Sequence, residues 1–168
     1  MKTATINIYK ALVLADVDAS TFKRVDGVLA GESDQLKNAV SSDSEESLDM
    51  NMLHGYMETR DAEIRASLAF ALVDEEDDLV VSNELDKDKA SFEYRLQVPE
   101  GFNKTRLAGL ARLIHNYIVQ GTLLSWYANH NMTGNVSADT LEDLELSIVC
   151  ALRVGFTKKP LQPFGPRN

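Results

Sequence analysis

Several features are scarce in this chain, and each shortage excludes a class of protein. Cys150 is the one cysteine, so no disulfide can form within the chain, and the disulfide-stapled class of secreted domains does not fit. No uninterrupted apolar run approaches the length of a membrane span. Asn7 and Lys10 interrupt the apolar stretch near the N-terminus, which argues against a signal peptide. We therefore expect a soluble, intracellular protein without a membrane partner.

Proline is also scarce, and it is unevenly placed. Three of the four prolines are Pro160, Pro163 and Pro166. A proline ring fixes φ and removes a backbone donor, so a segment this rich in proline does not form a regular element. The pattern predicts an extended C-terminal arm over residues 156–168.

Basic residues are fewer than acidic ones. The chain has 17 Lys and Arg against 26 Asp and Glu, a net charge of −9. Such a surface repels phosphate, which argues against general or sequence-specific nucleic-acid binding. Residues 153–168 hold four basic residues and no acidic one, a charge of +4, so the remaining chain carries −13. This asymmetry suggests that the basic tail docks on an acidic surface, such as that of another copy.

Catalytic and metal-binding patterns are missing as well. The chain has no G-x-S-x-G, no glycine-rich phosphate loop and no H-E-x-x-H. The acidic run at 74–78 lacks the alternating ligands and the glycine of a calcium loop. His115 and His130 lie about 22 Å apart along one helix, and His54 has no ligand partner at metal-binding spacing. Cys150 lies in an apolar helix, where we expect an inert core thiol. We predict no enzyme activity, no cofactor and no metal site.

What the sequence does contain is one long helical pattern, at residues 104–130. Its apolar residues recur at helical spacing, and a second apolar row covers another side, so little of its middle is left for water. A helix of this length spans roughly 40 Å. We expect the other elements to pack around it. The two rows are Leu107, Leu110, Ala111, Ile114, Tyr117, Ile118, Gly121, Leu124 and Ala128, and then Val119, Leu123 and Trp126.

Shorter helical patterns flank it. Residues 9–30 suggest a helix with a possible break near 18–20. A capping box opens the next helix at residue 42, and its apolar face continues to about residue 73. The last helix spans residues 138–153. Residues 3–8 alternate weakly and suggest a short strand or an extended arm.

Residues 79–82 and 91–98 are predicted to form a β-hairpin. The second strand alternates cleanly, with Phe92, Tyr94 and the following apolar residues on one face. A two-stranded hairpin is marginal in water, so it must lie on helices or pair with another chain. We expect this hairpin to leave the bundle or to extend a sheet with another chain, with Phe92 and Tyr94 binding the partner.

The predicted fold is therefore mainly α: a helical bundle around one long central helix, with a β-hairpin insertion and an extended C-terminal arm. Residues 1–155 form a single domain with the hairpin at about 79–98, and residues 156–168 form the arm. A free apolar arm needs a groove to fill, either on another subunit or on its own domain. The predicted partner-binding residues of the arm are Phe156, Lys158, Lys159, Pro160, Leu161, Pro163 and Phe164.

Four segments carry a family resemblance: an acidic helix opening (SSDSEESLDMNMLHGYMETRDAEI), a strand ending in Val-Pro (FEYRLQVPEGF), a long helix (LIHNYIVQGTLLSWY) and the tail motif KKPLQPFG. In this order the chain resembles small structural proteins encoded among the capsid and tail genes of phages and prophages of Bacteroides-type bacteria. Their layout is similar to the head–tail connector, or adaptor, proteins of long-tailed phages. The resemblance covers about residues 40–164 and implies no catalytic residues.

The resemblance implies a virion structural protein, a connector or neck subunit that forms a homo-oligomeric ring below the portal. Its partners would be the portal and tail or other neck proteins, and its location the virion, or the host cytoplasm before assembly. Three alternatives stay open: another tail-completion or homo-oligomeric scaffold protein, a non-viral protein-interaction module, and a small enzyme with an unrecognised site.

Overall fold

The computed structural model describes residues 1–28, 48–73, 89–131 and 136–153. Within these residues the chain is mostly helical with a two-stranded sheet, so the predicted mainly-α class is confirmed. The elements in chain order are β1 (Lys2–Tyr9), α1 (Lys10–Val28), α3 (Leu48–Leu68), β2 (Ser91–Val98), α4 (Lys104–Asn129) and α5 (Ala138–Arg153).

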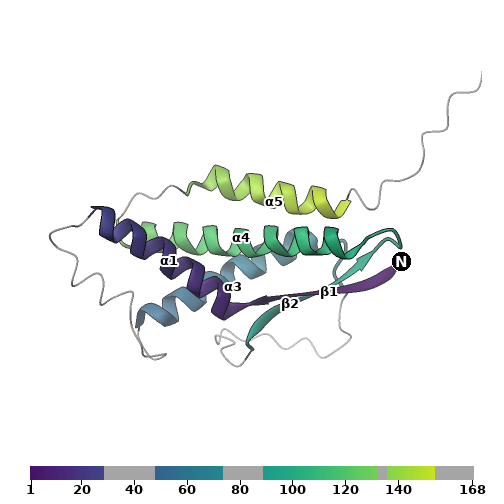
Figure 1. Cartoon of the computed structure of the whole chain (residues 1–168), viewed down its shortest axis with the longest axis horizontal. Coiled ribbons are helices and arrows are strands. Elements are labelled where there is room, and N and C mark those ends of the chain that lie inside the picture. The colour runs from purple at the N-terminus through teal and green to yellow at the C-terminus, as the bar shows by residue number, and fades with distance from the viewer. Residues whose placement is uncertain (29–47, 74–88, 132–135, 154–168) are drawn as a thin grey trace, which may run out of the picture.

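Helix α4 is the central element, as its sequence predicts. It packs against α1, α3, α5 and β1, and Figure 1 shows it running between α5 and the layer that holds α1, α3 and the sheet. Asn103 caps its start, where the side-chain Oδ1 accepts a hydrogen bond from the Arg106 backbone N–H at 2.9 Å. The buried residues of α4 are Leu110, Ile114, Tyr117, Ile118, Val119, Gly121, Thr122, Leu123, Trp126 and Tyr127.

The sheet joins two segments that are far apart in the chain. β1 pairs with β2 in antiparallel register, from Lys2 opposite Val98 to Tyr9 opposite Ser91. Residues 3–8 are therefore a strand, and residues 91–98 form the predicted strand but with β1 as a partner. The expected hairpin partner, residues 79–82, lies outside the described residues. Local sequence signals specify a strand's alternation but not its distant partner, which explains why this pairing was not predicted.

The apolar face of β2 is buried within the chain itself. Phe92 is 7% exposed and Tyr94 is fully buried, while the alternate residues of the strand are exposed. Ile6 and Ile8 of β1 lie in the same core. The expectation that this strand leaves the bundle and binds a partner through Phe92 and Tyr94 is therefore wrong. β1 supplies the second strand, and the helices cover the apolar face.

Helix α3 ends earlier than its apolar pattern suggests. The pattern continues to residue 73, but the helix stops at Leu68. After a turn, the Val73 backbone N–H donates to the Arg95 carbonyl at 2.9 Å, and the Gln97 N–H donates to the Ala71 carbonyl at 2.7 Å. These residues leave the helix because their backbone groups bond to the second edge of β2.

Helix α1 is continuous from Lys10 to Val28, so the possible break near residues 18–20 does not occur. Two hydroxyl groups near this position bond back to the helix. Ser20 Oγ donates to the Asp16 carbonyl at 2.8 Å, and Thr21 Oγ1 donates to the Val17 carbonyl at 3.0 Å. Such back-bonding satisfies the side chain without interrupting the backbone ladder.

Helix α5 begins as predicted, but Cys150 does not lie in the core. The Ser137 hydroxyl accepts a hydrogen bond from the Thr140 N–H at 3.2 Å, and Ile148 and Leu152 are fully buried. Cys150 is exposed, which corrects the expectation of a buried thiol. It follows Ile148 by two residues, or about 200° around the helix, and so lies on the outer side.

Two glycines of α4 have opposite surroundings. A Cβ at Gly121 would lie 2.4 Å from Cδ of Arg60, so the close approach of α3 requires glycine there. A Cβ at Gly109 would meet nothing within 4 Å. Glycine inside a helix is less stable than alanine by about 0.5–1 kcal/mol unless packing requires it.

The two glycines therefore make a matched pair of variants. Gly109→Ala should raise the free energy of unfolding of the monomer by about 0.5–1 kcal/mol. Gly121→Ala should lower it by about 1–3 kcal/mol, because Arg60 must shift to make room. Urea denaturation monitored by circular dichroism measures both changes. Equal effects of the two substitutions would contradict the packing of α3 against α4.

Candidate functional site

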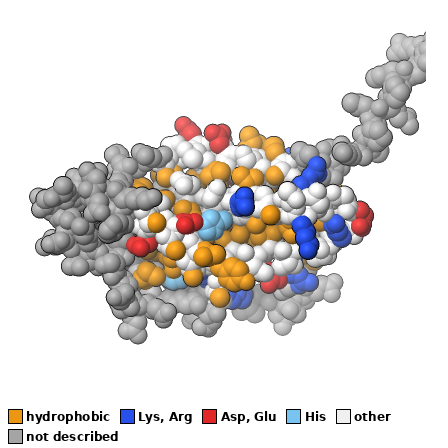
Figure 2. All heavy atoms as spheres, in the orientation of Figure 1, with side chains coloured by type: hydrophobic (Ala, Val, Ile, Leu, Met, Phe, Trp, Pro, Cys, Tyr) orange, Lys and Arg blue, Asp and Glu red, His pale blue; other side chains and the backbone are white. Residues whose placement is uncertain are grey.

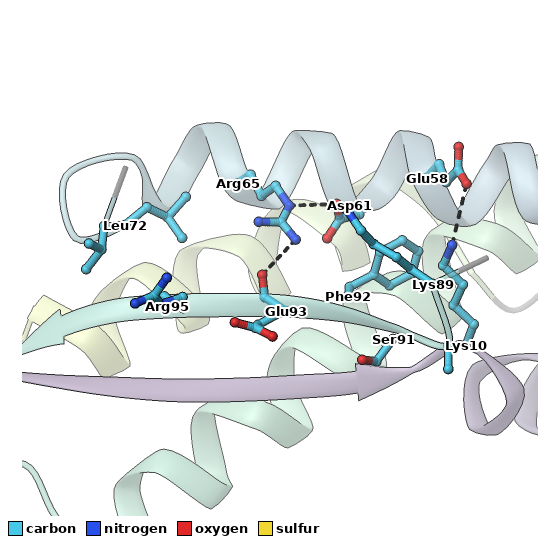
Figure 3. A pocket seen from close by; sticks show the side chains of 12 residues that line it. Lys10, Glu58, Asp61, Arg65, Leu72, Lys89, Ser91, Phe92, Glu93 and Arg95 are labelled. Carbon is cyan, nitrogen blue, oxygen red and sulfur yellow. Dashed lines mark hydrogen bonds and ion pairs between the residues drawn. The ribbon is translucent and has the colours of Figure 1, made fainter. Parts of the chain in front are cut away.

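A groove lies between α3 and the edge of β2, at the point where α1 begins (Figure 3). Its volume is about 880 Å³. Most of the lining is polar or charged, which distinguishes the groove from an apolar ligand pocket. The lining residues are Lys10, Glu58, Asp61, Arg65, Leu72, Val73, Lys89, Ala90, Ser91, Phe92, Glu93 and Arg95.

The groove exists because one edge of β2 is only partly covered by backbone. The backbone bonds of Arg95 and Gln97 to residues 71–73 lie on the edge away from β1. Alternate residues of a strand present their backbone groups to the same edge, so the Glu93 carbonyl also faces this side. Its hydrogen bond comes from a side chain, because Arg65 Nη2 donates to it at 2.9 Å. Arg65 thus takes the place that a neighbouring strand would occupy.

Arg65 is also the centre of a charged cluster. Its Nε lies 2.7 Å from Asp61 Oδ2, and its guanidinium lies over the Tyr94 ring at 4.6 Å from the centroid. The Tyr94 hydroxyl donates to the second oxygen of Asp61. Burial, followed by the negative charge of Asp61, raises the pKa of Tyr94 far above its ordinary value. The phenol therefore stays protonated and acts as a hydrogen-bond donor.

A similar arrangement lies at the other end of the groove. Lys10 Nζ is 3.6 Å from Glu58 Oε1 and 4.9 Å from the centroid of the Phe92 ring. The Lys10 side chain is only 6% exposed, and its backbone N–H donates to the Ala90 carbonyl at 3.0 Å. Each cation thus pairs with a carboxylate of α3 and lies on an aromatic ring of β2. The groove is a polar seam that holds α3, the start of α1 and β2 together.

A second polar cluster lies between α3 and α4. Arg60 bonds both carboxylate oxygens of Glu63, at 3.0 and 2.8 Å, and donates to Ser125 Oγ at 3.0 Å. The Tyr117 hydroxyl donates to Glu63 at 2.9 Å. Burial, followed by the hydrogen bond to Glu63, raises the pKa of Tyr117 to about 12. The carboxylate of Glu63 thus bonds both the guanidinium of Arg60 and the phenol of Tyr117, as expected for a structural network.

The described residues contain no group of three or more His, Cys, Asp or Glu side chains placed to hold a metal ion. His115 Nε2 lies 2.7 Å from Asp16 Oδ2, between α4 and α1. The His130 ring stacks on Trp126 at 4.2 Å. In the part of the chain that the structure covers, no helix combines the length and apolar character that a bilayer span requires.

Of the predicted partner-binding residues, the structure describes Phe92 and Tyr94, and it places both beside α3. Phe92 lines the groove, and Tyr94 bonds Asp61 beneath it. The residues of the arm lie outside the described part of the chain. Sequence reasoning missed the groove, because it depends on the pairing of β1 with β2. The spacing of Asp61 and Arg65 by four residues was its one local signal.

Comparisons with protein-family models, with curated proteins and with solved structures find no match to this chain.

The role of Arg65 can be measured directly. Arg65→Met should lower the free energy of unfolding by about 1–3 kcal/mol, because Asp61 loses its cation and the Glu93 carbonyl loses its donor. Arg112→Met is the matched control, since Arg112 is exposed and its loss should change stability by less than about 0.5 kcal/mol. Chemical denaturation compares the two. If the polar seam did not stabilise the fold, Arg65→Met and Arg112→Met would have the same free energy of unfolding.

Proposed function

We propose that this chain is a virion structural protein, a head–tail connector or neck subunit of a tailed phage or prophage that assembles through subunit–subunit contacts. The observation that carries the proposal is the architecture: a helical body around one long central helix with a small sheet. This is the layout that the resemblance to connector proteins implies. The four quoted segments supply the link to phage proteins.

The character of the groove is consistent with a structural role. It contains two pairs of ionised groups that bond each other, Arg65 with Asp61 and Lys10 with Glu58. Each of these charges is stabilised by a partner of opposite sign. The polar groups therefore fix the positions of the elements. In this proposal the functional surface is the outside of the subunit, including the arm at residues 156–168.

A homo-oligomeric scaffold outside a virion would use the same architecture. An experiment on the phage particle distinguishes a connector from such a scaffold. If the chain is a connector, a stop codon in its gene should yield filled heads and free tails that do not join. Electron microscopy and mass spectrometry of the purified particles provide the measurement.

Complementation supplies the control for this experiment. The full chain should restore joined particles that contain it, whereas a chain ending at Thr157 should not, because it lacks Leu161 and Phe164. Burying these two side chains contributes about 1.5–3 kcal/mol each, whereas exposed lysine pairs contribute about 0–1 kcal/mol. Normal, infectious particles without the protein would contradict the proposed function. Normal incorporation of the truncated chain would contradict only the role of the arm.

A further inference from the structure

Charges of opposite sign lie on the first halves of two neighbouring helices. α4 contains three basic residues, all within its first nine positions, and no acidic residue. α5 contains four acidic residues in its first half and one basic residue at its end. The exposed members of these sets are Lys104, Arg106 and Arg112 on α4, here called the basic patch, and Asp139, Glu142 and Asp143 on α5, here called the acidic patch.

The two patches lie toward opposite ends of the molecule. α4 and α5 pack side by side and run antiparallel, so their starts are far apart (Figure 1). α4 has 26 residues and is about 39 Å long. Figure 2 shows basic side chains over the start of α4 and acidic side chains over the start of α5. Exposed charges at such a separation are screened from each other, since the Debye length is about 8 Å at physiological salt.

Neither patch is neutralised by the described residues. No ion pair within residues 1–28, 48–73, 89–131 and 136–153 involves any of the six side chains. Glu100 lies just before α4, but its carboxylate lies 3.1 Å from the N-terminal ammonium group of Met1. Within the described residues, both patches therefore lack an ion-pair partner.

The basic patch is not explained by the helix that carries it. A helix N-terminus is the positive end of the macrodipole, so acidic residues stabilise it and basic residues do not. Asp139 at the start of α5 follows this rule, whereas Lys104 and Arg106 at the start of α4 violate it. Gly109 lies between Arg106 and Arg112, and packing within the chain does not explain it either, since a Cβ there would meet nothing within 4 Å. The exposed cations and the lack of a side chain at Gly109 together suit a close external contact.

We propose that a second copy of this chain docks head to tail, with its acidic patch on the basic patch of the first. This inference rests on the proposed function as an assembly subunit, and it names the surfaces that meet. Leu146, which is 62% exposed and follows Asp143 by three residues, would contact the helix backbone at Gly109. The contact joins different surfaces and leaves one patch of each kind free, so further copies add until a ring closes or a filament grows.

Charge reversal tests the pairing. The variant K104E/R106E/R112E and the variant D139K/E142K/D143K should each lose self-association by about tenfold or more in the full chain, because like charges then face each other. An equimolar mixture of the two variants should restore association. The reversed patch of one variant then meets the reversed patch of the other with opposite sign, and the two intact patches also pair. Analytical ultracentrifugation at 50 mM salt measures the association. Circular dichroism confirms that each variant is folded.

Three single substitutions refine the test, and Asp18→Lys is the control among them. Asp18 is exposed on α1, and Asp18→Lys should leave self-association unchanged, whereas Asp139→Lys should weaken it. Gly109→Leu should weaken association without unfolding the chain, because the added side chain projects into open space in the monomer.

The outcomes separate this inference from the proposed function. If the chain assembles and neither triple reversal changes its assembly, the pairing is wrong but the proposed function stands. Intact chain that stays monomeric at millimolar concentration and 50 mM salt contradicts the pairing. Loss of DNA binding in K104E/R106E/R112E, with unchanged self-association, would identify nucleic acid as the occupant and overturn the proposal.

Discussion

The structure depends on the burial of α4. From Leu110 to Tyr127 this helix contacts α1, α3, α5 and β1. Fully burying one Ile or Leu side chain contributes about 1.5–3 kcal/mol, whereas an exposed ion pair such as the N-terminal ammonium group of Met1 with Glu100 contributes about 0–1 kcal/mol. The apolar contacts of α4 therefore outweigh the surface charges in stability. In our proposal, the exposed charges instead determine which surfaces meet in an assembly.

The sheet connects the beginning of the chain to its middle. β1 and β2 are separated by more than 80 residues, and their pairing brings Lys10 at the start of α1 beside Glu58 of α3. Arg65 covers the remaining edge of β2 by bonding the Glu93 carbonyl. Such coverage by a charged side chain protects the edge from pairing with other strands. The polar seam thus stabilises the contact of α3 with the sheet and shields an edge.

The sequence predicted the elements whose signals are local. The apolar repeat of residues 104–130, the last helix at residues 138–153 and the alternation from Phe92 to Val98 all depend on neighbours within a few turns. The pairing of β1 with β2 and the early end of α3 at Leu68 depend on distant partners, so no local pattern contained them. The apolar neighbours of Cys150 predicted a buried thiol, but its angular position on α5 places it on the outer side. The groove was not predicted either, because it depends on the same distant pairing of β1 with β2.

The central claim is that β1 and α4 belong to one cooperative unit. Native-state hydrogen exchange, measured residue by residue in the monomer, tests it most directly. The amides of Ile6, Tyr94 and Ile118 are predicted to exchange only through global unfolding, at one common free energy. The contradicting result is rapid exchange at Ile6 and Tyr94 while Ile118 stays protected, because the sheet would then open independently of the helices.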